Sequence, residues 1–81
     1  MAAAPASPEL FRTSTFAIVE GGETLGLAYF VVERAGDSFV MIQCDLDSAG
    51  KVWNSTPCFR FADFEAACAR AVADAGPVFV S

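Results

Sequence analysis

The fold follows from one stretch of sequence, Leu25-Gly26-Leu27-Ala28-Tyr29-Phe30-Val31-Val32. Its β-branched and aromatic residues favour a strand. A strand with one wet face alternates apolar and polar residues, but this stretch is apolar at both alternating sets of positions. We therefore expect both faces of the sheet around it to be covered, and only one helix is expected from the rest of the chain. The second cover would be a second copy of the chain, another protein or a ligand.

Turn-forming sequences on either side of this stretch divide the chain into four expected strands. The strands are Ser14–Glu20, Leu25–Arg34, Ser38–Leu46 and Lys51–Thr56. The first connection contains Gly21 and Gly22, and glycine readily supplies the positive φ angles of tight hairpins. Pro57 is expected to end the fourth strand, because proline cannot donate a hydrogen bond to the ladder.

The lengths of the first two turns decide which side chains share a face. We predict a three-residue turn over 21–23, because a two-residue turn would set Glu20 opposite Glu23, and like charges there are destabilising. This turn places Phe16 and Ile18 under the helix. A three-residue turn over 35–37 would likewise pair Phe30 with Ile42.

A helix is expected between Asp63 and Gly76. Asp63 is a favourable N-cap, and Glu65 lies in the first turn, where the helix dipole favours an acid. Gly76 and Pro77 are typical of a helix C-terminus. The residues of one helix face are apolar or small: Phe64, Ala67, Cys68, Ala71, Val72 and Ala75. Residues 77–80 would form a short final strand or an apolar tail.

The predicted register assigns one face of the sheet to this helix and leaves the other open. The helix side carries Ala28, Phe30, Val32, Val40, Ile42 and Cys44. The open side carries Leu27, Tyr29, Val31, Phe39, Met41 and Gln43, with Glu33 and Asp45 at its edges. An apolar centre with a polar rim is typical of a binding face. Leu27, Tyr29, Val31, Phe39 and Met41 are therefore the predicted interface.

The predicted fold class is α+β, a four-stranded antiparallel meander with one C-terminal helix packed on one face. Residues 1–12 are expected to form a flexible N-terminal arm and residues 13–81 a single domain. This order of strands and helix is similar to that of the subunit of PC4-like and Whirly-like single-stranded DNA binders, over about residues 14–75. The resemblance implies a nucleic-acid-binding or regulatory function, but it is one of topology, and no contacting residue is carried over.

Composition argues against several classes of function. The formal charge is −5, and the five basic residues are scattered along the chain, so nucleic acid is an unlikely partner. There is no histidine, the commonest general base and metal ligand. The three cysteines, Cys44, Cys58 and Cys68, have no framework spacing, which indicates reduced thiols and a cytoplasmic location. No apolar run approaches the ~20 residues of a membrane span, so no membrane association is expected.

No motif in the sequence predicts catalysis, a metal site or a cofactor site, and we do not expect an enzyme. Asp45–Gly50 superficially resembles a calcium loop, but Ala49 stands where the fifth position needs an oxygen ligand. A polar hairpin turn is the favoured interpretation. Cys44 and Cys68 are interpreted as packing residues, because no histidine is present to activate a thiolate, whereas Cys58 is expected to be exposed. Trp53 could stack bases together with Tyr29 and Phe39, but a core or interface position is favoured.

The leading functional hypothesis is a small cytoplasmic module that associates with itself, as a homodimer, through the open sheet face. A separate protein partner is the variant of this hypothesis. The first alternative is the PC4-like function described above. The second is a binder of small apolar ligands, with a pocket between the sheet and its cover lined by Tyr29, Phe39 and Met41.

Overall fold

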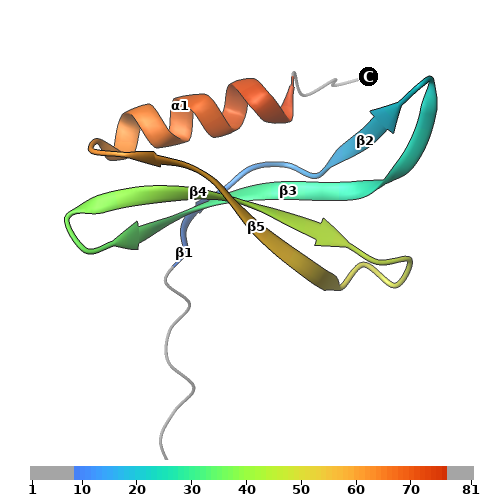
Figure 1. Cartoon of the computed structure of the whole chain (residues 1–81), viewed down its shortest axis with the longest axis horizontal. Coiled ribbons are helices and arrows are strands. Elements are labelled where there is room, and N and C mark those ends of the chain that lie inside the picture. Colours follow the sequence, from blue (N-terminus) through green and yellow to red (C-terminus); the bar gives the residue numbers. More distant parts are fainter. Residues whose placement is uncertain (1–8, 77–81) are drawn as a thin grey trace, which may run out of the picture.

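An antiparallel sheet carries a helix across one face (Figure 1). The computed structural model describes residues 9–76, and within them five strands and one helix are found. In chain order they are β1 (Glu9–Arg12), β2 (Phe16–Glu20), β3 (Glu23–Ala35), β4 (Ser38–Leu46), β5 (Val52–Phe61) and α1 (Phe64–Ala75). The predicted α+β fold with a C-terminal helix is confirmed, with a fifth strand added at the N-terminal side.

The additional strand is β1. Both β1 and β2 pair with β3, on the same side of it, so the two short strands together form one edge of the sheet. Thr13 lies at the break between them and is 9% exposed. Its backbone N–H donates to the Phe30 carbonyl at 2.9 Å, and its hydroxyl accepts from the Phe30 N–H at 3.0 Å. The sheet therefore includes Glu9–Arg12, which the sequence assigned to the N-terminal arm; residues 1–8 lie outside the described residues.

The first hairpin has a two-residue turn rather than the predicted three-residue turn. Gly21 and Gly22 take φ angles of +60° and +82°, and Glu20 pairs directly with Glu23. Two positive φ angles suit a type I′ turn, whose twist matches that of the strands. A register shift in β3, between Thr24 and Gly26, then restores the pairing of Phe16 with Ala28. Phe16 therefore lies on the helix side as predicted, where its ring stacks on Phe30 at a centroid distance of 4.9 Å.

The second hairpin also has a two-residue turn, and here the predicted register is wrong. Ala35 pairs with Ser38, and Gly36 takes a φ of +64°. Phe30 consequently pairs with Gln43 instead of Ile42. No later shift within β3 and β4 compensates for the shorter turn, so every side chain of β4 lies on the face opposite to the predicted one.

The strand β5 continues beyond Pro57, which was expected to end it. Pro57 pairs with Ile42, and the next pair is Phe59 with Met41, so Cys58 is the extra residue of a bulge. β5 lies at the edge of the sheet. Proline is tolerated at edges and bulges, because no ladder hydrogen bond has to be donated there.

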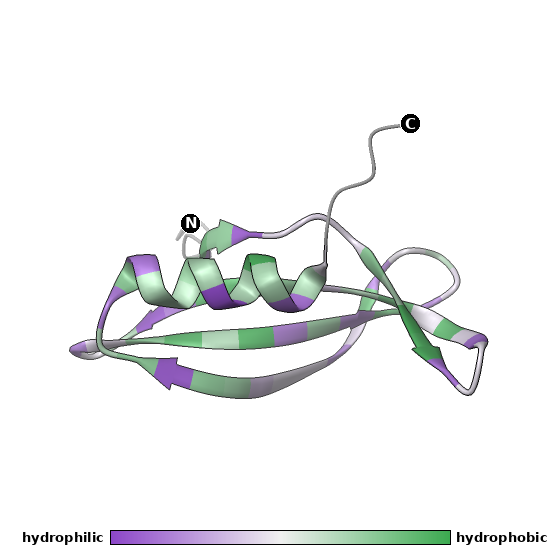
Figure 2. Cartoon of the chain, turned by 90° about the horizontal axis from the view of Figure 1, so that it is seen from above, coloured by the Kyte–Doolittle hydropathy of each residue, from purple (hydrophilic) through white to green (hydrophobic). Residues whose placement is uncertain are grey.

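The core lies between α1 and the central strands. Its buried members are Phe30, Val32, Met41, Ala67 and Ala71. The small side chains of Ala67 and Ala71 let the helix backbone approach the sheet closely. Seen from above, α1 runs along the sheet and shows both apolar and polar turns (Figure 2). At the N-terminal end of the helix, the Phe64 ring packs against that of Phe39 at 5.6 Å.

Both predicted ends of the helix are confirmed. The Asp63 carboxylate accepts a hydrogen bond from the Ala66 N–H at 3.1 Å, and Gly76 donates its N–H to the Val72 carbonyl at 3.2 Å. Gly76 has φ +88° and ψ 172°, a conformation that is essentially restricted to glycine. Val72, however, is 52% exposed although it belongs to the predicted apolar stripe.

Substituting the N-cap, Asp63→Ala, is expected to lower the free energy of unfolding by about 1 kcal/mol. The variant leaves the Ala66 N–H without its carboxylate acceptor at the positive end of the helix dipole. Urea denaturation measures the change. Asp37→Ala removes the same charge from an exposed turn and is the matched control. Equal effects of the two substitutions would contradict a specific capping role for Asp63.

Candidate interaction surface

The candidate functional site is the sheet face opposite α1, which we call the open face. The strand register places three rows of mainly apolar residues side by side on it. The rows are Leu27, Leu46 and Val52; Tyr29, Cys44 and Ser55; and Val31, Ile42 and Pro57. Within residues 9–76 no second helix lies over this face.

The rows differ in how far the protomer itself covers them. Val31 and Cys44, at the centre of the sheet, are only 3% and 7% exposed. Leu27 and Val52, at one end, are 47% and 43% exposed. The open face therefore presents its most accessible apolar area near the turns of the first and third hairpins. Large exposed aliphatic side chains close together in one row are typical of a surface that meets a partner.

Charged side chains lie at the other end of the face. Glu33, Val40 and Arg60 form the next row, and the Arg60 guanidinium donates to the Ser38 hydroxyl at 2.8 Å. An apolar centre beside a charged rim matches the anatomy of protein interfaces. The rim therefore carries charges of both signs.

Arg12 reaches over this face from β1. Its guanidinium lies 4.5 Å from the centroid of the Tyr29 ring and donates to both carboxylate oxygens of Glu9, at 2.8 and 3.0 Å. The hydrogen bond to Glu9 is the largest cause that raises the pKa of Arg12 above its ordinary value. Arg12 therefore stays charged, but its charge is balanced within the protomer.

The predicted interface residues are divided between the two faces. Leu27, Tyr29 and Val31 lie on the open face, in line with the prediction for β3. Phe39 and Met41 instead lie beneath α1, where Met41 is fully buried and Phe39 packs on Phe64. Their places on the open face are taken by Val40, Ile42 and Cys44, which the sequence assigned to the helix. The length of the turn at Gly36 causes this exchange, and a Gly-Asp pair between two apolar runs was the signal that could have revealed it.

The same exchange separates the residues of two other predicted sites. Tyr29 lies on the open face, whereas Phe39 and Met41 lie on the helix face, so they cannot line one ligand pocket. A base-stacking platform of Trp53, Tyr29 and Phe39 is likewise not assembled. Trp53 lies on the edge strand β5 and is 68% exposed.

Burial disfavours the thiolate form of two of the three cysteines. Burial is the largest cause that raises the pKa of Cys44, and the Ser55 hydroxyl at 3.9 Å from its Sγ acts in the opposite direction. Burial also raises the pKa of Cys68 on α1. Both thiols are therefore held as neutral packing groups. Cys58 is exposed, and its Sγ lies 3.4 Å from the Thr56 carbonyl oxygen.

The acidic loop that resembles a calcium site is a hydrogen-bonded turn. One carboxylate oxygen of Asp47 accepts from the N–H groups of Ala49 and Lys51, both at 2.9 Å. These bonds stabilise the hairpin between β4 and β5, as Asx turns commonly do. Among the described residues, no cluster of three or more acidic or cysteine side chains could hold a metal ion.

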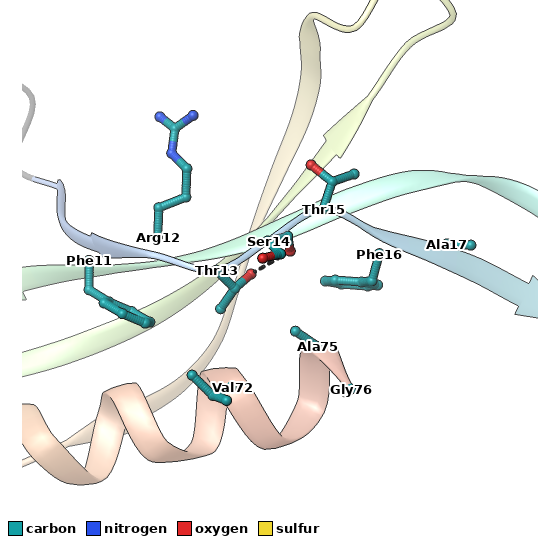
Figure 3. A pocket seen from close by; sticks show the side chains of 10 residues that line it. All are labelled: Phe11, Arg12, Thr13, Ser14, Thr15, Phe16, Ala17, Val72, Ala75 and Gly76. Carbon is teal, nitrogen blue, oxygen red and sulfur yellow. Dashed lines mark hydrogen bonds between the residues drawn. The ribbon is translucent and has the colours of Figure 1, made fainter. Parts of the chain in front are cut away.

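The structure also has a groove on the helix face of the sheet. It lies between the C-terminal half of α1 and the break between β1 and β2, with a volume of about 670 Å³ (Figure 3). Its apolar walls are Phe11, Phe16, Val72 and Ala75. The sequence did not predict it, because the break at Thr13 has no local signature.

Comparison with known proteins identifies no relative: no family model, curated protein or solved structure matches the chain. The functional argument therefore rests on the surfaces described above. Of the helices in residues 9–76, none is both long and apolar enough to cross a membrane.

Proposed function

We propose that this chain is a small, non-enzymatic cytoplasmic module that associates with a second copy of itself through the open face. The observation that carries the proposal is the set of three adjacent apolar rows across β3, β4 and β5. Burying such a surface is favourable by roughly 25 cal/mol per Å² of apolar area. Two such sheets would stack about 10 Å apart, with their side chains interdigitated.

The composition of the rim supports a second copy as the partner. In a two-fold interface, residue i of one protomer contacts residue j of the other, and j contacts i. Glu33 and Arg60 lie in one row with opposite charges, so each can face the other residue of the second protomer. An acidic chain of net charge −5 can associate with itself only where its surplus charge is kept away from the contact.

Light scattering in line with gel filtration tests this proposal. The expected mass is about twice the 8.5 kDa of the protomer at high micromolar concentration. A protomer mass throughout that concentration range would overturn the proposal. The measurement should be repeated at high salt, because an apolar contact is expected to persist when charges are screened.

A binder of small apolar ligands is the second candidate function. The observation that favours it is the groove beside α1, whose volume of about 670 Å³ lies within the range of about 300–1,000 Å³ typical of ligand sites. Its walls combine aromatic and aliphatic side chains with the hydroxyl-bearing residues 13–15. Ligand binding here would use the helix face, so it is compatible with self-association through the open face.

Single-stranded DNA is not expected to bind at about 0.15 M salt, despite the topological resemblance to DNA-binding subunits. Arg12 and Arg70 are paired with Glu9 and Asp74, and the chain has a net charge of −5. Fluorescence anisotropy with a labelled oligonucleotide measures the affinity. Tight binding under these conditions would make nucleic-acid recognition the leading function.

A further inference from the structure

The groove beside α1 is apolar on both sides although it opens to solvent. Phe11 and Phe16 form one wall, and Val72 and Ala75 of α1 form the other. Figure 3 shows Phe11 and Phe16 on the helix side of the segment, whereas Arg12 and Thr15 point away. The groove therefore contains no inward-pointing charge among these labelled side chains. Val72 is 52% exposed in this wall, whereas the other residues of the helix stripe are buried or half-buried.

We propose that this groove is the docking site of the apolar sequence that directly follows α1, Val78-Phe79-Val80. The occupant is thus a segment of the same chain. This inference is independent of the proposed self-association, because the groove and the open face lie on opposite sides of the sheet, and it competes with the second candidate, ligand binding in the same groove.

The helix ends at the groove. Gly76 lines the groove itself, and its N–H donates to the carbonyl of Val72. The chain therefore leaves α1 at the edge of the groove, next to Val72.

The segment is long enough to return from Gly76 to Val72. Val72 lies four residues before Gly76, about 6 Å back along the helix axis. An extended chain covers roughly 3.3 Å per residue, so Phe79 can return by about 10 Å. That reach exceeds the return distance to Val72, so the segment is long enough for the Phe79 ring to lie against Val72.

The side chains of the segment are also chemically compatible with those of the groove. The segment is uncharged and alternates β-branched residues with one aromatic ring, and the groove offers two aromatic rings and two aliphatic side chains. Aromatic pairs contribute beyond the area that they bury. Thr13 also lines the groove, and its hydroxyl already donates to the Ser14 carbonyl and accepts from the Phe30 N–H. An apolar occupant would therefore not deprive this hydroxyl of a hydrogen-bond partner.

A double-mutant cycle on the full chain tests the docking. Val72→Ala and Phe79→Ala are compared singly and together by urea denaturation. If Phe79 packs on Val72, the two effects are expected to be non-additive, with a coupling of roughly fivefold in the unfolding equilibrium constant. Val52→Ala, on the open face and 43% exposed, is the matched partner that should show additivity with Phe79→Ala. Additive effects of Val72→Ala and Phe79→Ala would overturn the proposal.

Nuclear magnetic resonance distinguishes the possible occupants directly. Nuclear Overhauser contacts between the Phe79 ring and the Val72 methyl groups, within one molecule, are the expected result. A mixture of isotope-labelled and unlabelled chains should show these contacts to be intramolecular, and exclusively intermolecular contacts would overturn the assignment.

Phe79→Asp should increase the fluorescence of an added anilinonaphthalene sulfonate dye by emptying the groove. Equal dye binding by the wild type and this variant would mean that the groove is free for an external ligand, contrary to the proposal.

Discussion

Replacing Phe30 with alanine is expected to destabilise the protomer by about 3–5 kcal/mol. The side chain is 5% exposed, belongs to the buried cluster beneath α1 and stacks on Phe16. The substitution removes an aromatic ring from the centre of β3 and leaves a cavity that the surrounding sheet can fill only in part. A domain of this size has a total stability of roughly 5–15 kcal/mol, so the variant should unfold at a far lower urea concentration.

Phe59→Ala provides the matched control for this measurement. Phe59 lies on the edge strand β5, is 43% exposed and is covered on one side by the Arg70 guanidinium at 4.1 Å. Its removal loses less buried area and opens no enclosed cavity, so a clearly smaller loss of stability is expected. A denaturation midpoint for Phe30→Ala equal to that of the wild type would contradict the position of Phe30 in the core.

Ile42→Asp is expected to convert the assembled protein into a folded monomer. Ile42 lies in the middle of the open face, between Val31 and Pro57. A carboxylate buried at a dry interface between two sheets is costly unless it is paired, whereas on a solvated sheet face it costs little. Light scattering should therefore report the protomer mass, while circular dichroism remains like that of the wild type.

The neighbouring substitution, Met41→Asp, tests the register with the same change of side chain. Met41 is fully buried beneath α1, so the introduced charge has no access to water in the folded protomer. Unfolding is the expected outcome for this variant. If Met41→Asp instead gave a folded monomer and Ile42→Asp unfolded, the two faces of β4 would be exchanged. An unchanged mass for Ile42→Asp would show that the assembly does not use the open face.

Much of the fold could be predicted from local sequence signals. The apolar stretch of β3, the capped helix and the positions of the first two turns each depend on residues within a few positions of one another. Asp63 and Gly76 stabilise the helical turns next to them, and a glycine in a turn affects only its own φ angle. These signals are therefore independent of the rest of the chain. The division of the β3 side chains into two faces was predictable for the same reason, since Phe30 and Val32 alternate with Tyr29 and Val31.

The candidate site depended on information that is not local. The sequence determined that β4 is apolar on both faces, with Phe39 and Met41 on one and Val40 and Ile42 on the other. Both sets can face a helix, so hydropathy does not choose between them. The two-residue turn at Gly36 and the packing of Met41 against Ala67 and Ala71 made the choice. A strand has a side-chain period of two, so a change of one residue in that turn exchanged the buried set of β4 with the exposed one, and this only the tertiary structure decided.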